Sequence, residues 1–254
     1  MIDKDKIAIR AEHVSKTFQI PHEKISTLRG AFVNLLKTKS YEKFTALDNV
    51  TFNIEKGEFF GIIGRNGSGK STLLKILANI YTPDSGKVTL HGRVSPFLEL
   101  GIGFNPELSG KDNVYLNATV LGLRKKQIDE KFASIVAFSG LRRFIDQKIK
   151  NYSSGMQVRL AFSVAIHANR DILLMDEVLA VGDSNFQQKC LKQFEKFRKQ
   201  KKTIILVTHD MDTVRQYCDR VLLLRNGKIE TIGEPAGVIR KYEQQNITDI
   251  RSSS

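Results

Sequence analysis

The sequence predicts an α/β fold with an inserted helical subdomain, and three observations lead to this prediction. Short apolar runs rich in Val and Ile alternate with longer segments of helical period along the 254 residues. An Asn226-Gly227 pair separates the last two apolar runs, and this dipeptide is typical of a β-hairpin turn. Between Gly103 and Asn151 the strand pattern disappears and helical patterns replace it. The length suits one large domain or two small ones, and we expect a single domain over residues 1–254.

Strands are predicted where short apolar runs are bounded by turn residues or charges. In chain order they cover Ile7–Val14, Val50–Ile54, Phe59–Ile63, Val88–Leu90, Ile172–Met175, Ile204–Val207, Arg220–Arg225 and Lys228–Thr231. Helices are predicted where apolar residues recur at spacings of three and four. They begin at Lys70, Gly110, Lys125, Ser154, Asn185, Met211 and Pro235.

The composition excludes several classes of protein. Hydrophobic residues make up 41% and charged residues 26% of the chain, so wholesale disorder is not expected. No apolar stretch approaches the roughly 18 residues of a membrane-spanning helix, and the charged N-terminus leads into no signal-peptide core. The two cysteines, Cys190 and Cys218, have no metal-binding or disulfide spacing, which predicts a cytosolic protein in a reducing compartment.

The net charge of +13 predicts an anionic partner. The chain has 40 Lys and Arg against 27 Asp and Glu, with a dense basic run from Lys196 to Lys202. A nucleotide, a nucleic acid and an anionic membrane surface all fit this charge. The sequence has neither the aromatic motifs of RNA-binding modules nor zinc-finger spacing. The charge alone does not choose between the three kinds of anionic partner.

The segment from Gly64 to Ser71 matches the phosphate-binding loop (P-loop) pattern G-x-x-x-x-G-K-[ST]. It follows an apolar strand (FFGII) and opens a helix (STLLKILANI), which is the context that the motif requires. Backbone N–H groups of such a loop wrap phosphates, and the helix N-terminus adds a favourable dipole. We expect Lys70 to contact the β- and γ-phosphates and the Ser71 hydroxyl to bind Mg²⁺. The residues predicted to bind ATP here are Gly64, Arg65, Asn66, Gly67, Ser68, Gly69, Lys70, Ser71 and Thr72.

Two adjacent carboxylates end a second apolar strand, Ile172–Met175. Ligands of parallel sheets bind at the carboxyl ends of the strands, where both acids are expected to lie. Asp176 suits the Mg²⁺ shell, and Glu177 is placed to polarise the attacking water. Two acids at a strand end are weak evidence for such a site by themselves, and they are stronger evidence in a chain that also has a P-loop.

A third motif, Tyr152–Met156 (YSSGM), begins an apolar helix ahead of the acidic strand. Ser-Ser-Gly at a helix start is, by itself, only a helix cap. In this order along the chain, however, the motifs resemble those of the ABC ATPases, whose signature L-S-G-G-Q occupies this place. The resemblance runs from about Ile7 to Glu243. It implies the P-loop NTPase fold of that family, with a mixed sheet core, an antiparallel β part and a helical subdomain at about residues 103–165.

The same resemblance implies roles for further residues. Asp183 ends a segment similar to the D-loop, and His209 matches the switch histidine and is expected to be catalytic with Glu177 and Lys70. Phe18 matches the aromatic residue that stacks on adenine, with Tyr41 and Phe44 as alternatives. Simpler interpretations also exist: a core histidine, a core phenylalanine and a helix cap at Asp183. The residues expected to contact the ATP held by a second copy are Ser153, Ser154, Gly155 and Met156.

The sequence departs from the family pattern in two places. The signature keeps Ser153 and Gly155 but lacks one glycine and the glutamine. The Q-loop glutamine is also missing, and Glu99 falls near its place in the segment LELGIGF. Because a carboxylate also joins Mg²⁺ shells or orients water, Glu99 is assigned to a coupling loop and is an additional metal-ligand candidate.

These variants resemble the ATP-binding subunits of bacterial exporters of O-antigen, capsule and teichoic acid. The resemblance implies ATP and Mg²⁺ as cofactors, a homodimer, and two copies of a polytopic membrane subunit that handles a lipid-linked polysaccharide. It also implies a location on the cytoplasmic face of the plasma (inner) membrane and no nucleic-acid partner. A C-terminal carbohydrate-binding domain, present in some relatives, is not expected because only about a dozen residues follow Lys241.

Two other functions fit parts of the sequence. A soluble ABC ATPase acting on nucleic acid or ribosomes fits the charge of +13. Those that resemble translation factors carry two signature motifs, whereas this chain has one, and repair ATPases insert long coiled coils. A P-loop kinase or GTPase has no need for YSSGM, and the guanine-reading N-K-x-D motif is missing. ATP-driven export is therefore the preferred prediction.

An insertion at about residues 21–44 separates the first two strands by more than a hairpin needs. Its apolar residues recur at spacings of three and four, which predicts a short amphipathic helix flanked by lysines. Such a helix fits a membrane interface or a membrane subunit, and the alternative is a helix packed on the body. The apolar stripe consists of Ile25, Leu28, Phe32, Leu35 and Leu36.

Overall fold

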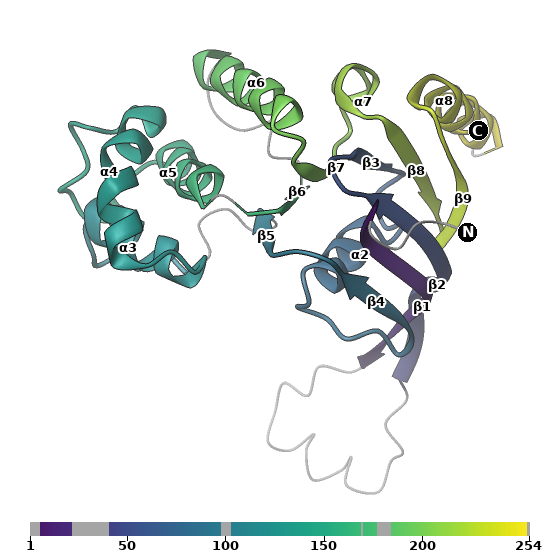
Figure 1. Ribbon diagram of the computed structural model, residues 1–254. Coiled ribbons are helices and arrows are strands. Elements are labelled where there is room, and N and C mark those ends of the chain that lie inside the picture. The colour runs from purple at the N-terminus through teal and green to yellow at the C-terminus, as the bar shows by residue number, and fades with distance from the viewer. Residues whose placement is uncertain (1–5, 22–40, 98–102, 169, 177–183, 253–254) are drawn as a thin grey trace, which may run out of the picture.

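The structure is a computed structural model that describes residues 6–21, 41–97, 103–168, 170–176 and 184–252. Two sheets form its body (Figure 1). An antiparallel sheet has the order β2-β1-β4, with β1 at Ile7–Pro21, β2 at Tyr41–Glu55 and β4 at Ser85–Leu90. The second sheet has the order β5-β6-β7-β3-β8-β9, with β5 at Val94–Phe97, β6 at Ile172–Asp176, β7 at Thr203–Val207, β3 at Phe59–Ile63, β8 at Arg220–Arg225 and β9 at Lys228–Gly233.

The second sheet is parallel except for the β8–β9 hairpin. Its central strands β3 (FFGII) and β7 (TIILV) are buried at every residue, as continuous apolar runs in a parallel sheet should be. Parallel strands place their carboxyl ends at one edge, so the segments that follow β3, β6 and β7 start from the same edge. The structure confirms the predicted α/β fold with a mixed sheet and an antiparallel part.

Helix α2 (Lys70–Leu77) lies between the two sheets and joins their cores. Its buried residues include Leu73, Leu74 and Leu77, which belong to one apolar cluster with residues of β1 and β2 and of the parallel strands. The opposite face of the parallel sheet packs against α6 (Ser184–Lys199), α7 (Met211–Tyr217) and α8 (Pro235–Ser252). This arrangement fixes the start of α2 between the two sheets.

Helices α3 (Gly110–Val120), α4 (Lys125–Ser139) and α5 (Ser154–His167) form the helical region, which lies to one side of the sheets (Figure 1). They bury a core of their own. An aromatic cluster connects this region to α6. The ring centroid of Phe186 on α6 lies 5.7 Å from that of Phe138 on α4 and 5.8 Å from that of Phe162 on α5. The helical region is therefore attached to the body through side chains as well as through the chain itself.

Four strands extend beyond their predicted bounds by more than one residue: β1, β2, β4, which begins at Ser85, and β9, which ends at Gly233. One further strand was not predicted. β1 continues past Val14 to Pro21, and β2 begins at Tyr41, so both ends of the predicted insertion at residues 21–44 are strand. Residues 22–40, with the apolar stripe, lie outside the described residues. The strand β5 was not predicted, whereas the bounds of β3 and β8 are confirmed as predicted.

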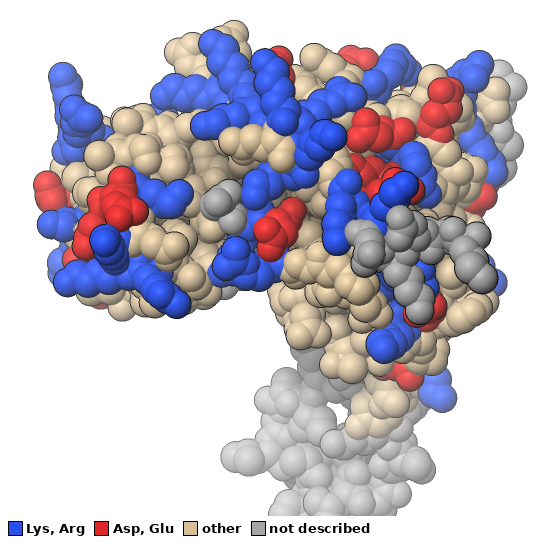
Figure 2. Space-filling model, viewed as in Figure 1, with Lys and Arg blue, Asp and Glu red and all other residues tan. Residues whose placement is uncertain are grey.

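The basic run from Lys196 to Lys202 lies at the end of α6 and in the turn before β7. Figure 2 shows that Lys and Arg side chains gather over α6. Within the run, Arg198 forms an ion pair with Asp219 at 3.3 Å, and the Lys202 ammonium donates to the Arg170 carbonyl at 2.9 Å. Two of these cations thus bind the protein itself, which weakens the interpretation of the run as a nucleic-acid surface.

Candidate functional site

The P-loop leaves the carboxyl end of β3, at the centre of the parallel sheet, and turns into α2. Two of its glycines are required by geometry. Gly64 has φ +151°, and a Cβ there would lie 2.2 Å from the Leu224 carbonyl oxygen. Gly69 has φ +105°, and its Cβ would lie 2.4 Å from the Ala46 carbonyl oxygen. No larger residue fits either position without moving backbone, so the loop is held tightly against β2 and β8.

Lys70 is 7% exposed and lies at the first position of α2. Its ammonium donates to the carbonyl oxygens of Gly64 at 2.7 Å and Arg65 at 2.9 Å. The N-cap residue of α2 is Gly69, which has no side chain to cap the helix, and the N–H groups of this helix end also favour an anion. The loop therefore combines a buried cation with a helix N-terminus, a combination suited to phosphate.

A cavity of about 350 Å³ opens on the P-loop and brings together residues from distant parts of the chain. Phe44 and Ala46 come from β2, Lys70 and Ser71 from the start of α2, and Asp176 from the end of β6. A hydroxyl and a carboxylate are hard oxygen donors of the kind that Mg²⁺ prefers, so Ser71 and Asp176 fit the predicted metal site. The lining residues are Phe44, Ala46, Asn66, Gly67, Gly69, Lys70, Ser71, Thr72 and Asp176.

The aromatic residue at this cavity is Phe44, one of the two alternatives to Phe18. Phe18 and Phe44 are cross-strand partners, but the Phe18 ring packs edge-on against Tyr81 with centroids 5.7 Å apart. Phe44 is 45% exposed and lines the cavity. The predicted role of Phe18 in adenine stacking remains a prediction, and the structure places Phe44, not Phe18, among the described residues that line the cavity. Ala46, which the sequence analysis did not select, lines the cavity and closes over Gly69.

The signature segment begins α5 in the helical region. Ser153 is the N-cap residue of α5, and its hydroxyl accepts from the Met156 amide at 3.2 Å. Tyr152, just before it, is buried and donates to the Phe144 carbonyl oxygen at 2.7 Å. The side chains of Ser153 and Ser154 are exposed, and neither residue lines the P-loop cavity of the described chain. The structure therefore does not bring the signature and the P-loop cavity together within one chain.

His209 is exposed and lies between β7 and α7, so it is not a core histidine. The next residue, Asp210, caps α7 by accepting from the amides of Asp212 at 3.0 Å and Thr213 at 3.3 Å. The Thr213 hydroxyl also donates to Asp210, and this bond lowers the pKa of the Asp210 carboxyl. The cap fixes the backbone beside His209. Glu99, Glu177 and Asp183 lie outside the described residues.

Comparison with known proteins identifies the family of the chain. Residues 47–180, which include the P-loop, the signature and the acidic strand, match the ABC transporter family. The chain belongs to the ABC transporter family. It is 48% identical over 202 residues to an O-antigen export system ATP-binding protein of Klebsiella pneumoniae, covering 80% of this chain and 82% of that relative. A second Klebsiella pneumoniae protein of the same description is 43% identical, covering 93% of this chain and 97% of the relative.

A teichoic acids export ATP-binding protein of Lactococcus lactis is 41% identical, and the match covers 94% of this chain but 51% of that relative. Among solved structures, a dimeric ATP-binding cassette bound to ADP and Pi in a post-hydrolysis state superimposes with a TM-score of 0.72. That match is 24% identical and covers 89% of this chain and 98% of the other. It supports the ABC ATPase fold. No described helix has the length and apolar character needed to cross a membrane.

Proposed function

We propose that this chain is the ATP-binding and ATP-hydrolysing subunit of a transporter that exports a lipid-linked cell-surface polysaccharide. The observation that carries the proposal is the P-loop cavity, where Lys70, Ser71 and Asp176 meet at the carboxyl end of the parallel sheet. The names of the relatives, which describe O-antigen and teichoic acids export, support the choice of cargo class.

A direct test is to remove the gene and restore either the wild-type chain or Lys70→Ala. We expect the wild type to restore polysaccharide at the cell surface, whereas cells with Lys70→Ala retain the lipid-linked polymer inside. Surface and intracellular polymer are measured separately by gel electrophoresis with carbohydrate staining. Normal surface polysaccharide in cells without the gene would contradict the export function.

The proposed active form is a homodimer in which each ATP lies between the P-loop of one copy and the signature of the other. The separation of the two motifs within one described chain supports this arrangement, because a γ-phosphate at the P-loop leaves the signature of the same chain without a ligand. Ser153 and Ser154 are exposed at the start of α5, where backbone N–H groups favour an anion. ATP then bridges the copies, whereas ADP lacks the bridging phosphate.

Each residue at the proposed site has a separate task. Lys70 holds the β- and γ-phosphates, replacing the carbonyl oxygens to which it donates in this structure. Ser71 and Asp176 would hold Mg²⁺, which when bound neutralises charge on the phosphate oxygens. Glu177 accepts a proton from the attacking water, and His209 contacts the γ-phosphate from the loop after β7. Asp183 belongs to the dimer contact, and Phe44, with Phe18 as the alternative, stacks on adenine.

The signature role is tested by removing two helix caps. Ser153 caps α5 and Ser109 caps α3, each accepting from the amide three residues ahead, at 3.2 and 3.0 Å, and the Ser109 hydroxyl also donates to the Asp112 carboxylate at 2.6 Å. We expect Ser153→Ala and Ser109→Ala each to cost about 1 kcal/mol and to lower the melting temperature by about 2–4 °C. Only Ser153→Ala should lower ATPase activity, by about tenfold or more, because only Ser153 meets ATP in the dimer. Equal ATPase losses would show that Ser153 is merely a cap.

The helical region is the part of the structure best suited to contact a membrane subunit. Val120, at the end of α3, is 76% exposed, and Leu108, Leu116 and Phe144 are also exposed in this region. Exposed apolar side chains on one subdomain are typical of a protein contact. Glu99 belongs to the segment that connects β5 with this region, so it is placed in sequence to transmit the state of the γ-phosphate. We propose two copies of a polytopic membrane subunit as the partner, at the cytoplasmic face of the plasma membrane.

The stripe at residues 25–36 is proposed to act in the assembled transporter, although it lies outside the described residues. We expect a Leu28→Ser, Phe32→Ser double variant to keep its melting temperature and nucleotide affinity as an isolated subunit but to lose export in cells. Leu74→Ser is the destabilising control, because Leu74 is fully buried on α2 and its loss should cost about 2–5 kcal/mol. A double variant that melts as early as Leu74→Ser yet exports normally would identify the stripe as ordinary core.

A further inference from the structure

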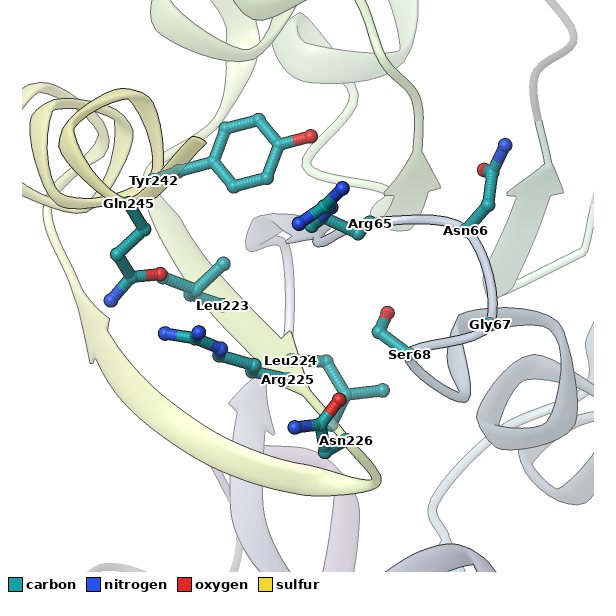
Figure 3. Close-up of a pocket in the computed structure, with 10 residues that line it drawn as sticks. All are labelled: Arg65, Asn66, Gly67, Ser68, Leu223, Leu224, Arg225, Asn226, Tyr242 and Gln245. Carbon is teal, nitrogen blue, oxygen red and sulfur yellow. The ribbon is translucent and has the colours of Figure 1, made fainter. Parts of the chain in front are cut away.

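A second cavity, of about 330 Å³, adjoins the P-loop and is separate from the nucleotide cavity. It lies where three elements far apart in the sequence meet: the P-loop, the turn after β8, and α8 (Figure 3). Arg65 and Ser68 come from the P-loop, Arg225 from the end of β8, and Tyr242 and Gln245 from α8. The P-loop pattern predicted that Arg65 and Ser68 bind ATP, whereas no motif assigns a ligand to Arg225, Tyr242 or Gln245.

The cavity is polar and positively charged. Two guanidinium groups, those of Arg65 and Arg225, line it, and no carboxylate lines it among the described residues. The hydroxyl of Tyr242 points toward the same space, facing Arg65 (Figure 3). The Gln245 amide also lies at the rim, where it donates to the Glu230 carboxylate outside the lining.

Ser68 provides an independent observation that points to a polar ligand. The residue is 4% exposed, and its Oγ has no hydrogen-bond partner in the described chain. Figure 3 shows this hydroxyl directed into the cavity. A buried hydroxyl without a partner loses the hydrogen bonds that it had in water, so native structures seldom keep one unless a ligand or water satisfies it.

We propose that this cavity binds a small organic phosphate. Arginine side chains pair with phosphate through parallel hydrogen bonds, and a phosphomonoester has enough oxygens for two guanidinium groups and a hydroxyl at once. A carboxylate has only two oxygens for the same donors. The volume exceeds that of inorganic phosphate alone and falls at the small end of ligand pockets. Leu223 and Leu224, each 1% exposed, give the cavity an apolar floor for the organic part of the ligand.

The proposed ligand would influence the nucleotide site. Asn66 and Gly67 line both cavities, so a phosphate held by Arg65 and Ser68 constrains the loop that binds ATP. Coupling between two sites is reciprocal, so nucleotide and phosphate change the affinity of each other by the same factor. The second cavity is thus an effector site beyond the proposed export function, through which a phosphorylated metabolite adjusts nucleotide affinity.

The test is a calorimetric titration of glycerol 3-phosphate into the full chain, with the P-loop cavity occupied by AMPPNP and Mg²⁺. We expect one binding site per chain in the wild type and no binding of glycerol. Arg225→Gln should weaken glycerol 3-phosphate binding by about tenfold or more, because one charge-assisted pair is lost. Arg143→Gln is the matched control: Arg143 is exposed in the helical region, and its loss should leave the affinity unchanged. Tyr242→Phe should weaken binding without altering the charge.

Several results would overturn the proposal: no binding to the nucleotide-loaded wild type, equal affinity in Arg225→Gln, or an equal loss in Arg143→Gln. Failure of the proposed function is distinguishable, because it appears as a failure of AMPPNP to bind. The titration then proceeds on the nucleotide-free chain with the same variants and the same criteria. AMPPNP affinity is measured with and without glycerol 3-phosphate. The wild type should show a change of about threefold or more, and Arg225→Gln should show none.

Discussion

Lys70→Ala is expected to lose ATP binding, with an affinity at least about thirtyfold below that of the wild type. The Lys70 ammonium is nearly buried, and the P-loop carbonyl oxygens hold it at the start of α2. A triphosphate that enters this site loses its hydrogen bonds to water, and the interaction with the charge of Lys70 is the main contribution that offsets this loss. Truncating one partner of a buried charge pair costs about 2–5 kcal/mol, and about 1.4 kcal/mol corresponds to a factor of ten.

The measurement is calorimetric titration of ATP with Mg²⁺, with the melting temperature as a check on folding. Lys75→Ala is the matched control, since Lys75 lies on the same helix but does not line the P-loop cavity. We expect it to bind ATP like the wild type. Equal ATP affinities in Lys70→Ala and Lys75→Ala would refute the phosphate-binding role of the loop.

Glu177→Gln is expected to bind ATP normally and to hydrolyse it at least about a hundredfold more slowly. The P-loop and Asp176 stay intact in this variant, so the phosphates keep their contacts, whereas the attacking water loses the group that accepts its proton. A positioned general base contributes about 10²–10⁴ to the rate. The effect should appear in the turnover number and not in the dissociation constant.

Phosphate release under saturating ATP measures this turnover. Glu195→Gln is the control for loss of a carboxylate, because Glu195 is exposed on α6 and distant in sequence from the motifs. Its turnover should equal that of the wild type. A Glu177→Gln protein that releases phosphate as fast as Glu195→Gln would assign the general base to another residue.

The fold was predictable where local pattern and tertiary environment agree. The apolar runs of β3 and β8 lie in the middle of the parallel sheet, and their bounds follow from the sequence. β5 lacks such a pattern because it has four residues, one of them Pro96. It lies at the edge of the sheet, where a missing N–H is tolerated, and only its pairing with β6 makes it a strand.

The long arms of β1 and β2 escaped prediction because bulges interrupt their alternation. His13 and Asn49 face each other with positive φ values of 51° and 53°, and their side chains are hydrogen-bonded at 2.8 Å. The register shifts here, between Ala11 and Val14, so the alternating pattern in the sequence stops at Val14. Bulges of this kind depend on the partner strand, which a single strand's pattern does not contain.

The site was predictable as a set of motifs but not as a geometry. The P-loop pattern identified Lys70 and Ser71, and the acidic strand identified Asp176, which the structure places at one cavity. The sequence did not distinguish Phe18 from Phe44, because that choice depends on how the antiparallel strands pair and on the ring of Tyr81. No sequence pattern predicts the second cavity, because it forms only where the folded chain brings α8 beside the P-loop.

We propose that ATP joins two copies of this chain, and the molar mass in solution is the most direct test of this dimer. Light scattering coupled to gel filtration would measure the mass of Glu177→Gln with Mg²⁺ and either ATP or ADP. We expect twice the chain mass of 28.7 kDa with ATP and a single chain mass with ADP, and no dimer when Ser153→Ala is added. The same mass with both nucleotides, with full ATP occupancy, would contradict the sandwiched dimer.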